Sequence, residues 1–458
     1  MSGWYCRKAT MKLSIIGTGN VGLVTGACFS ALGHEVRCAD IDSGKIARLQ
    51  RLEIDSQEPA LADLVSRNVE AGRLSFTTDT PAAAAWAEVV FLCVETPQGE
   101  DGKPDLERIR AATSDIAGGI EGFTLIVVKS TVPVGTTETL RQLVSATTEK
   151  SFSIACNPEF LKAGSAVSDF REPDRVVAGC DDQRSLELLR ELYKDFTGGG
   201  PFLEVDTRTA ELIKYASNAM LACRISFMNS LAGLCEQLGA DAGELARGIG
   251  LDSRIGSGAL APSPGYGGSC LPKDIRALID TLREHGLDTR LFDAVEDVNE
   301  AQKASHLERL RSFLGDLQGR RIAVLGLSFK AGSDDITNSA SEVLIRQLVE
   351  AGAEVAAWDP AATANMQRVF PGIEYSSDPY EAARNACAIA IMTEWDSLKE
   401  LDFESLATLV KNKLVLDCRG ICNPATLRKL GFDYCAVGRP PSLLEPERPQ
   451  DAIDGAKR

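Results

Sequence analysis

A buried apolar run, a glycine-rich turn and an apolar helix open the chain in that order. Residues 13–17 (Leu-Ser-Ile-Ile-Gly) are predicted to form a buried strand, and an apolar helical stretch continues to about Leu32. A second strand is predicted over 35–39, with Asp40 directly after it. Strand-like runs recur later in the chain, at 89–94, 125–129 and 152–156. This order of elements predicts a doubly wound parallel sheet.

The pattern changes to one long helical run over 207–238. This stretch contains no proline, and its first glycine is Gly233. It predicts a helical connector that is longer than a single α/β domain needs. An oligomer interface along this helix and a purely intramolecular packing role are both compatible with the pattern.

The second half of the chain repeats the organisation of the first. A strand is predicted over 321–326, a helix over 342–350 and another strand over 353–358, which Asp359 closes. In both halves a strand ends in glycine, a helix ends near glycine (Gly33 and Gly352), and the next strand ends in aspartate. The second copy lacks the full glycine turn, so we expect it to bind a different nucleotide.

These patterns predict an α/β protein with two Rossmann-like doubly wound domains joined by a long central helix and a helical region. The expected boundaries are 11–206, 207–305 and 306–438, with a disordered tail over 439–458 because of its four prolines. Residues 1–10 are expected to be a dispensable extension. The stretch 13–32 is not read as a secretory signal, because a phosphate-binding turn interrupts it.

Composition narrows the function classes. The net charge of −16 disfavours binding to nucleic acid and to anionic membranes. Thirteen cysteines, an odd number in apolar and helical contexts, indicate reduced thiols and a cytoplasmic protein. Cys418 and Cys422 have no second ligand pair, so no metal site is expected.

The turn Gly17-Thr-Gly19-Asn-Val-Gly22 lies between a predicted strand and a predicted helix. Its glycines permit a tight turn, a close approach of a pyrophosphate and close packing of helix on strand. Asp40 follows about 20 residues later, where a carboxylate can accept hydrogen bonds from ribose hydroxyls. An acidic residue there favours NAD over NADP, although Lys45 nearby argues the other way.

Cys270 is the candidate nucleophile. Three glycines (Gly265, Gly267 and Gly268) precede it, and Pro272 fits the start of a helix whose dipole favours a thiolate. The alternative is a buried cysteine that acts as a small hydrophobic residue. Asp274, four residues later, could act on water or simply cap the helix.

Lys214 and Asn218 are also four residues apart, on the long helix. Together they could hold an oxygen on which negative charge develops. From the residues alone, a solvated helix face is the preferred interpretation.

From Met11 to roughly Asn423 the chain resembles the nucleotide-sugar 6-dehydrogenases, the UDP-glucose/GDP-mannose dehydrogenase family. Besides the glycine turn, the resemblance rests on six ordered blocks: Lys129-Ser-Thr-Val-Pro-Val-Gly135, Asn157-Pro-Glu-Phe-Leu161, Pro173-Asp-Arg-Val-Val177, Glu211-Leu-Ile-Lys214-Tyr-Ala-Ser-Asn218, Gly265-Tyr-Gly-Gly-Ser-Cys-Leu-Pro-Lys-Asp274 and Gly326-Leu-Ser-Phe-Lys330.

This resemblance implies an NAD domain, a central dimerisation region with the catalytic cysteine, and a domain that holds the sugar nucleotide. The implied activity is NAD-dependent four-electron oxidation of UDP-glucose to UDP-glucuronate through a thiohemiacetal and a thioester on Cys270, in support of polysaccharide synthesis. The Arg254-Ile-Gly256 run favours UDP-glucose over GDP-mannose, and Arg254 is expected to reach the partner's site in a homodimer.

The resemblance also implies roles for individual residues. The catalytic set is Cys270, Lys214, Asn218, Asp274, Glu159 and Thr131. The cofactor set is Gly17, Gly19, Asn20, Val21, Gly22, Asp40, Lys45, Thr96, Pro97, Ser130 and Thr131. The substrate set is Glu159, Phe160, Leu161, Lys214, Asn218, Arg254, Tyr266, Gly267, Phe329, Lys330 and Arg419.

The chain departs from the family pattern at a few positions: Asn20 replaces Tyr, Ala163 replaces Glu, Thr337 and Ala340 replace Arg and Pro, and Gly420 replaces Asn. Three alternatives stay open: the same chemistry on GDP-mannose or a UDP-N-acetylhexosamine, a single-step hydroxyacid-type dehydrogenase that needs no thiol, and a non-catalytic NAD-binding scaffold.

Overall fold

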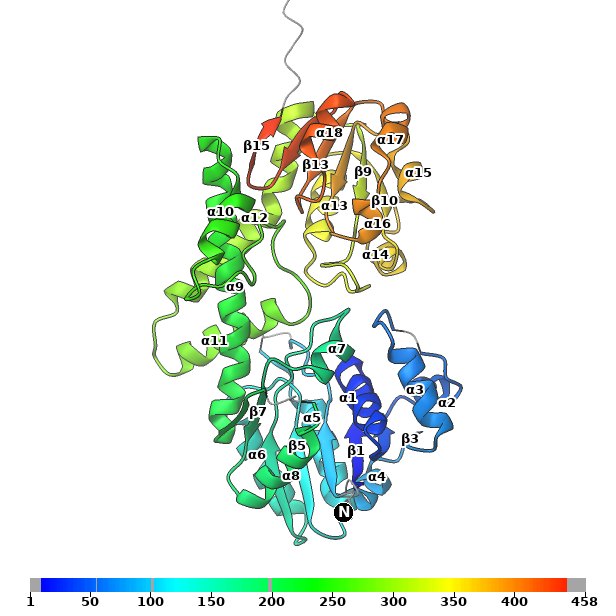
Figure 1. Cartoon of the computed structure of the whole chain (residues 1–458), viewed down its shortest axis with the longest axis vertical. Coiled ribbons are helices and arrows are strands. Elements are labelled where there is room, and N and C mark those ends of the chain that lie inside the picture. Colours follow the sequence, from blue (N-terminus) through cyan, green and yellow to red (C-terminus); the bar gives the residue numbers. More distant parts are fainter. Residues whose placement is uncertain (1–9, 55, 100–102, 197–199, 443–458) are drawn as a thin grey trace, which may run out of the picture. The chain divides into compact units, whose positions relative to one another are not determined.

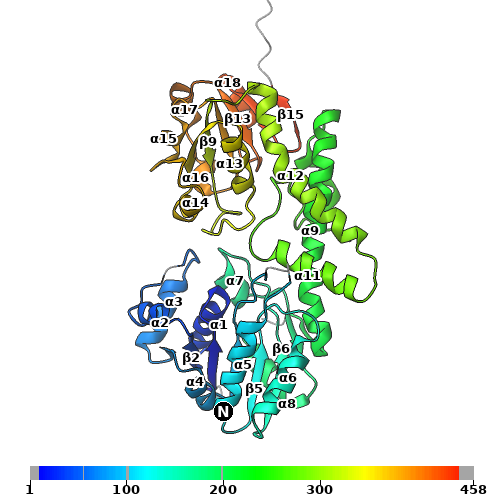
Figure 2. The same cartoon turned by 180° about the vertical axis from the view of Figure 1, so that it is seen from behind.

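The computed structural model describes residues 10–54, 56–99, 103–196 and 200–442. The chain folds as two compact units. The first unit contains the chain up to Ala219 together with Lys273–Asp288, and the second contains Met220–Pro272 together with the chain from Thr289 onward. Each unit is built around its own sheet (Figures 1 and 2). The predicted central region, 207–305, is divided between the two units.

The first unit contains an eight-stranded sheet in the order β3-β2-β1-β4-β5-β6-β7-β8. Its strands are β1 (Lys12–Ile16), β2 (Glu35–Ala39), β3 (Leu74–Thr77), β4 (Val89–Leu92), β5 (Thr124–Val128), β6 (Phe152–Cys156), β7 (Val176–Gly179) and β8 (Phe202–Val205). The first six are parallel, as predicted, but β7 pairs with β6 in the antiparallel direction.

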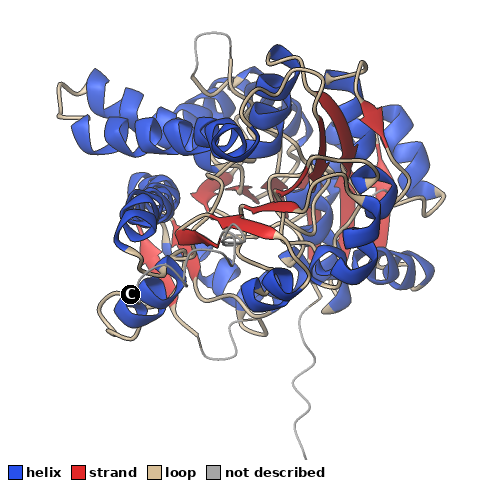
Figure 3. Ribbon diagram, turned by 90° about the horizontal axis from the view of Figure 1, so that it is seen from above, coloured by secondary structure: helices blue, strands red, loops and turns tan. Residues whose placement is uncertain are grey.

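Helices cover both faces of this sheet, which explains why its central strands are mostly apolar on both faces. On one face, α1 (Asn20–Ala31), α2 (Ser43–Gln50), α3 (Leu61–Glu70), α7 (Ala166–Arg171) and α8 (Gln183–Tyr193) contribute to the core. On the other lie α4 (Thr80–Trp86), α5 (Glu107–Gly119) and α6 (Thr136–Thr147). Helices flank the strands throughout Figure 3.

The second unit repeats this winding in a seven-stranded sheet with the order β11-β10-β9-β12-β13-β14-β15. Its strands are β9 (Arg321–Leu325), β10 (Glu354–Trp358), β11 (Glu374–Tyr375), β12 (Ala388–Ile391), β13 (Leu414–Asp417), β14 (Asp433–Ala436) and β15 (Arg439–Ser442). The predicted internal repeat is therefore confirmed: β9 and β10 take the same places in the second sheet, third and second from one edge, that β1 and β2 take in the first.

The helices of the second sheet also divide between two cores. One core takes side chains from α10 (Ala242–Gly250), α12 (Arg290–Leu314), α13 (Ala340–Glu350) and α14 (Thr363–Val369), and the other from α15 (Pro379–Ala383), α16 (Asp396–Lys399), α17 (Phe403–Leu409) and α18 (Pro424–Lys429). Two further helices, α9 (Thr207–Leu238) and α11 (Leu271–Glu284), run through the boundaries between the units. Helix α9 is the long helix that the sequence predicts.

Among the described residues, no helix combines the length and the apolar character that crossing a membrane requires.

The predicted disordered tail begins too early. Residues 439–442 form strand β15, which pairs antiparallel with β14 at the edge of the sheet. Pro440 and Pro441 suggested disorder, but an edge strand tolerates proline because part of its backbone faces away from the ladder. Residues 443–458, like residues 1–9 of the predicted extension, lie outside the described residues.

An aspartate follows the second strand of each copy, and the two carboxylates have different surroundings. Asp40 is only partly buried. Asp359 is buried, and its Oδ2 accepts hydrogen bonds from the backbone N–H groups of Leu327 (2.7 Å) and Ser328 (3.2 Å) and from Nε1 of Trp395 (3.0 Å). Its Oδ1 accepts from two further backbone N–H groups. The second carboxylate therefore serves to fix the loop after β9.

Candidate active site

The glycine turn between β1 and α1 has the geometry that a pyrophosphate site needs. Gly17 has a φ of +96°, a conformation that favours glycine. A Cβ at position 22 would lie 1.8 Å from the carbonyl oxygen of Gly17, so only glycine fits there. At Gly19 the nearest atom to an added Cβ is Oε1 of Glu95, at 3.7 Å. No side chain caps α1, and its first turn carries no acidic residue, so its N-terminal N–H groups suit an anion.

Asp40 carries a stabilised negative charge beside this turn. Its Oδ2 accepts hydrogen bonds from the backbone N–H and the hydroxyl of Thr18 (2.8 and 2.7 Å), and Nζ of Lys45 lies 3.1 Å away. Burial acts to raise the pKa of Asp40, but these hydrogen bonds, one from Asp42 and the charge of Lys45 lower it overall. Lys45 therefore neutralises Asp40 in part, and the charged carboxylate is suited to ribose hydroxyls and unfavourable for a 2′-phosphate.

The remaining predicted cofactor residues lie at strand ends of the same sheet. The hydroxyl of Thr96, after β4, donates to the carbonyl oxygen of Thr131, after β5, at 2.7 Å. The hydroxyl of Ser130 donates to the carbonyl oxygen of Val94 at 2.6 Å. The loops after β4 and β5, with Pro97 in the first, are thus joined at the carboxyl edge of the sheet, where doubly wound folds bind ligands. Asn20 and Val21 are the first residues of α1. The residues present fit a dinucleotide.

Lys214 and Glu159 form a buried ion pair. Nζ of Lys214 lies 3.0 Å from Oε1 of Glu159, and the two side chains are 6% and 9% exposed. The other carboxylate oxygen of Glu159 accepts from the backbone N–H of Leu161 at 2.6 Å. Phe160 lies under two cations, with Nζ of Lys214 5.4 Å and the guanidinium of Arg175 3.7 Å from its ring centre.

A second buried polar cluster surrounds Asp274, which is 1% exposed. Nδ2 of Asn218 donates to Oδ2 of Asp274 at 2.6 Å, and Nζ of Lys273 lies 2.7 Å from Oδ1. The interpretation of Lys214 and Asn218 as a solvated helix face is therefore wrong. Both side chains are buried, and each meets a carboxylate from another part of the first unit, which offsets the cost of burying a polar group. Lys273 is a member of this cluster to which the sequence reasoning assigned no role.

A cavity of about 100 Å³ opens beside Glu159, Phe160 and Leu161. Lys129, a second residue without an assigned role, also lines it. Nζ of Lys129 donates to Oδ1 of Asn157 (3.0 Å) and to the hydroxyl of Tyr193 (3.2 Å). Burial lowers the pKa of Lys129 to about 8. This lysine fixes Asn157, the first residue of the loop that carries Glu159.

In the second unit, Cys270 directly precedes α11, in which Pro272 is the second residue, as predicted. Among the twelve described cysteines, which form no disulfide, Cys270 is the exposed one. Burial raises the pKa of other thiols, such as those of Cys28 and Cys93, to about 12, which leaves them protonated. The interpretation of Cys270 as a buried hydrophobic residue is therefore wrong.

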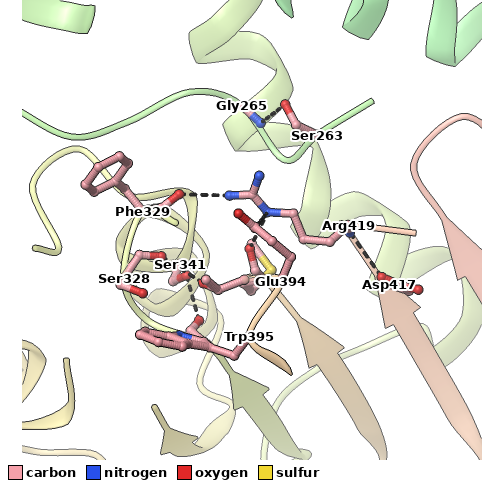
Figure 4. A network of polar contacts seen from close by, with 12 residues as sticks. Ser263, Gly265, Ser328, Phe329, Ser341, Glu394, Trp395, Asp417 and Arg419 are labelled. Carbon is pink, nitrogen blue, oxygen red and sulfur yellow. Dashed lines mark hydrogen bonds and ion pairs between the residues drawn. The ribbon is translucent and has the colours of Figure 1, made fainter. Parts of the chain in front are cut away.

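The glycines before Cys270 pack against the loop after β9. A Cβ on Gly268 would lie 3.0 Å from the ring of Phe329, and one on Gly267 would lie 2.5 Å from the carbonyl oxygen of Asn338. Nη2 of Arg419 donates to the carbonyl oxygen of Phe329 at 2.8 Å (Figure 4). Residues predicted to bind substrate, Gly267, Phe329 and Arg419, are thus brought together in the second unit.

Glu394 completes this network and was not found from the sequence. Its Oε2 lies 2.9 Å from Nε of Arg419 (Figure 4). The same Nε also donates to the carbonyl oxygen of Met392 at 3.0 Å. Nζ of Lys330 lies 5.9 Å from the ring centre of Phe329. Gly420 has a φ of +64°, a region that both glycine and asparagine tolerate, which explains this departure from the family pattern. Nothing in the structure explains Thr337.

Arg254 does not join this cluster. It follows α10, its side chain is 87% exposed, and its guanidinium pairs with Asp252 at 2.6 Å.

Among the described residues, no group of three or more His, Cys, Asp or Glu side chains is placed to hold a metal ion.

Comparison with known proteins identifies the family of this chain. Models of the UDP-glucose/GDP-mannose dehydrogenase family match residues 11–197 (NAD binding domain), 208–301 (central domain) and 323–424 (UDP binding domain). The chain is 44% identical to a UDP-glucose 6-dehydrogenase of Rhizobium meliloti, with 94% of this chain and 100% of the relative covered, and 42% identical to one of Pseudomonas aeruginosa, with 94% and 98% covered. The structure of a UDP-glucose dehydrogenase from Pyrobaculum islandicum superposes with a TM-score of 0.88 at 36% identity, covering 94% of this chain and 98% of that one. This chain therefore belongs to the UDP-glucose/GDP-mannose dehydrogenase family.

Proposed function

We propose that the protein oxidises UDP-glucose to UDP-glucuronate in two NAD-dependent steps. The observation that carries the proposal is the exposed thiol of Cys270, at the start of a helix, in a chain that also has an intact dinucleotide turn. A single-step hydroxyacid-type dehydrogenase has no use for such a thiol, and a scaffold has no use for the buried Lys214, Asn218 and Asp274.

Bound NAD supplies the hydride acceptor for both oxidations. The Cys270 thiolate adds to the C6 aldehyde that the first oxidation produces, which gives a thiohemiacetal. The second oxidation turns this adduct into a thioester, and water then displaces the thiolate to give the carboxylate. For each sugar, one water is consumed, two NAD molecules in turn each accept one hydride, and three protons are released as the alcohol becomes the carboxylate.

The buried polar residues of the first unit have chemical roles in these steps. Lys214 and Asn218 carry hydrogen-bond donors suited to an oxygen on which negative charge develops. Asp274 is a carboxylate suited to the hydrolytic water, and its hydrogen bonds to Asn218 and Lys273 hold it in place. Glu159 and Thr131 serve the proton transfers, and with Ala163 at the family's usual Glu position, Glu159 carries the acidic role alone.

The second unit is proposed to hold the sugar nucleotide. Arg419, Lys330 and Phe329 lie at the carboxyl edge of its sheet and offer two cations and an aromatic ring. A diphosphate needs such cations, since the chain as a whole is acidic.

We also propose a homodimer in which Arg254 reaches the partner's site. Met220, Phe227 and Leu234 on α9 are spaced by seven residues and are all exposed (61%, 55% and 49%), so they form one apolar stripe on the helix. Leu251 and Ile255, also exposed, flank Arg254.

The reduced cysteines support a place in the cytoplasm, where UDP-glucuronate would supply polysaccharide synthesis.

The deciding measurement is the number of NADH molecules formed per UDP-glucose consumed, which should be two. Replacement of Cys270 by Ser should abolish the second oxidation, whereas Cys223→Ser, a half-buried thiol on α9, should change nothing. A yield of one NADH, or full turnover by Cys270→Ser, would overturn the proposal. A panel with GDP-mannose and UDP-N-acetylhexosamines tests the sugar, and preference for either would replace UDP-glucose.

A further inference from the structure

One face of α12 carries polar side chains that are buried inside the second unit. Asn299, Gln302, Lys303 and His306 follow the three- and four-residue spacing that places side chains on one side of a helix. Asn299, Lys303 and His306 are at most 2% exposed. Buried polar groups need hydrogen-bond partners. Asn299 and His306 find theirs in the loop that leads to Cys270, whereas Nζ of Lys303 lies 2.8 Å from Oε1 of Glu300 on the same helix.

Asn299 binds both backbone groups of one residue in this loop. Its Oδ1 accepts from the N–H of Tyr266 at 2.7 Å, and its Nδ2 donates to the carbonyl oxygen of Tyr266 at 3.1 Å. The amide thus pairs with the backbone as a neighbouring strand would. Gln302 adds a hydrogen bond from Nε2 to the carbonyl oxygen of Ser263 at 2.8 Å.

His306 holds the loop at a third point. Its Nε2 lies 3.0 Å from the carbonyl oxygen of Pro264, and its Nδ1 lies 3.5 Å from Sγ of Cys418. Burial lowers the pKa of His306 to about 4, so the ring carries one proton near neutral pH. A carbonyl oxygen can only accept, so that proton is on Nε2, and Nδ1 can accept from the thiol. The imidazole is therefore neutral and links the loop to the end of β13.

The loop packs so closely against α12 at Gly265 that no side chain fits there. Its φ is +112°, and a Cβ there would lie 2.7 Å from Cγ of Lys303. At the near end, Asn229 of α9 binds the N–H of Ser263 at 2.9 Å and its hydroxyl at 3.2 Å, and Ser263 is also in contact with Gly265 (Figure 4). At the far end, the N–H of Gly268 donates to the carbonyl oxygen of Thr337 at 2.7 Å.

We propose that Asn299, with Gln302 and His306, positions Cys270 for addition to the aldehyde. None of the three is assigned to touch the reacting atoms; they act through the backbone of residues 263–266. The proposal rests on the function proposed above for Cys270. It predicts that loosening this face of α12 slows the thiol-dependent second oxidation. The first oxidation needs no nucleophile and should keep its rate once the enzyme is in sufficient excess to bind all the UDP-glucose, even if the contact through Tyr266 is weakened.

The test is a single-turnover experiment with enzyme in excess over UDP-glucose and saturating NAD, with NADH release followed in time. The wild type should show two phases of equal amplitude. In Asn299→Ala the first phase should keep its rate, and the second should slow by about 10²-fold, the usual cost of a misplaced reacting group. Ser305→Ala is the matched control, because this hydroxyl on α12 bonds only within its own helix, to the carbonyl oxygen of Gln302.

Gln302→Ala provides a second variant at the less buried edge of the face, with a smaller slowing of the same phase expected. If Asn299→Ala fails to fold, the second phase of Gln302→Ala tests the positioning role instead. His306→Gln, which keeps a donor for Pro264, should retain more of the second phase than His306→Phe. Equal slowing of both phases would reveal a merely structural role, and unchanged phases would remove any role; either result overturns the positioning proposal alone. One NADH from the wild type would instead overturn the proposed function and, with it, this inference.

Discussion

The side-chain amide of Asn218 donates a 2.6 Å hydrogen bond to Oδ2 of Asp274, a carboxylate 56 residues later in the chain. With Nζ of Lys273 on its other oxygen, Asp274 is held in one orientation while almost fully buried. A carboxylate held in this way is suited to act on a water molecule, which leads to the first prediction.

Replacement of Asp274 by Asn should slow hydrolysis of the thioester by about 10² to 10⁴-fold, because the amide cannot accept a proton from water. The acyl adduct on Cys270 should then accumulate and be detected by mass spectrometry of the quenched enzyme. Asp280→Asn, a more exposed carboxylate on the same helix, is the control. A normal rate without adduct would show that Asp274 only caps and orients.

The Lys214–Glu159 pair allows stability to be separated from catalysis. Lys214→Met alone should lower the free energy of unfolding by about 3–5 kcal/mol, because it leaves a buried charge without its partner. The double variant Lys214→Met, Glu159→Leu should recover most of this loss and stay inactive. Urea unfolding and NADH release measure the two effects. Recovery of activity in the double variant would remove both residues from the mechanism.

His306 should make stability depend on pH between about 4 and 6.5. Burial lowers the pKa of His306 to about 4, so in this range the unfolded chain binds a proton that the folded chain does not. This contribution to stability is full above pH 6.5 and declines as the pH falls, by about 3 kcal/mol in total. Unfolding in urea at several pH values should show a shallower slope for His306→Gln and an unchanged slope for the exposed His285→Gln. Parallel slopes for all three proteins would contradict the assignment.

The apolar stripe on α9 predicts the oligomeric state. Phe227→Glu should place a charge in the proposed interface and shift the protein from dimer to monomer in sedimentation analysis. Val349→Glu, at a comparably exposed apolar position on α13, should leave the dimer intact. If Arg254 acts in the partner's site, the Phe227→Glu monomer should also lose activity. A wild-type monomer would exclude the proposed interface.

Local sequence signals predicted the elements but not the burial of the polar site. Helix α9 spans 207–238 as predicted, because the run lacks proline and its one internal glycine is tolerated. The burial of Lys214 could not be predicted, because lysine is usually exposed and its partner, Glu159, lies 55 residues away in the chain. Periodicity within one helix carries no information about such a partner. For the same reason, nothing in the helical pattern of α12 indicated that Asn299 would bind the backbone of Tyr266.

Asp40 and Asp359 differ in how far their carboxylate oxygens are already occupied by hydrogen bonds from the protein, and this difference separates the functions of the two sheets. Both acids follow the second strand of their copy. Oδ1 of Asp40 accepts one hydrogen bond, from the N–H of Asp42, whereas each oxygen of Asp359 accepts at least two from N–H groups of the protein. A sugar hydroxyl could bind Asp359 only by displacing hydrogen bonds of the protein itself, whereas Oδ1 of Asp40 can accept another. The two copies of the fold therefore use the corresponding aspartate for different purposes. Asp40→Ala should change ligand choice in the first copy, whereas Asp359→Ala should disturb folding of the second.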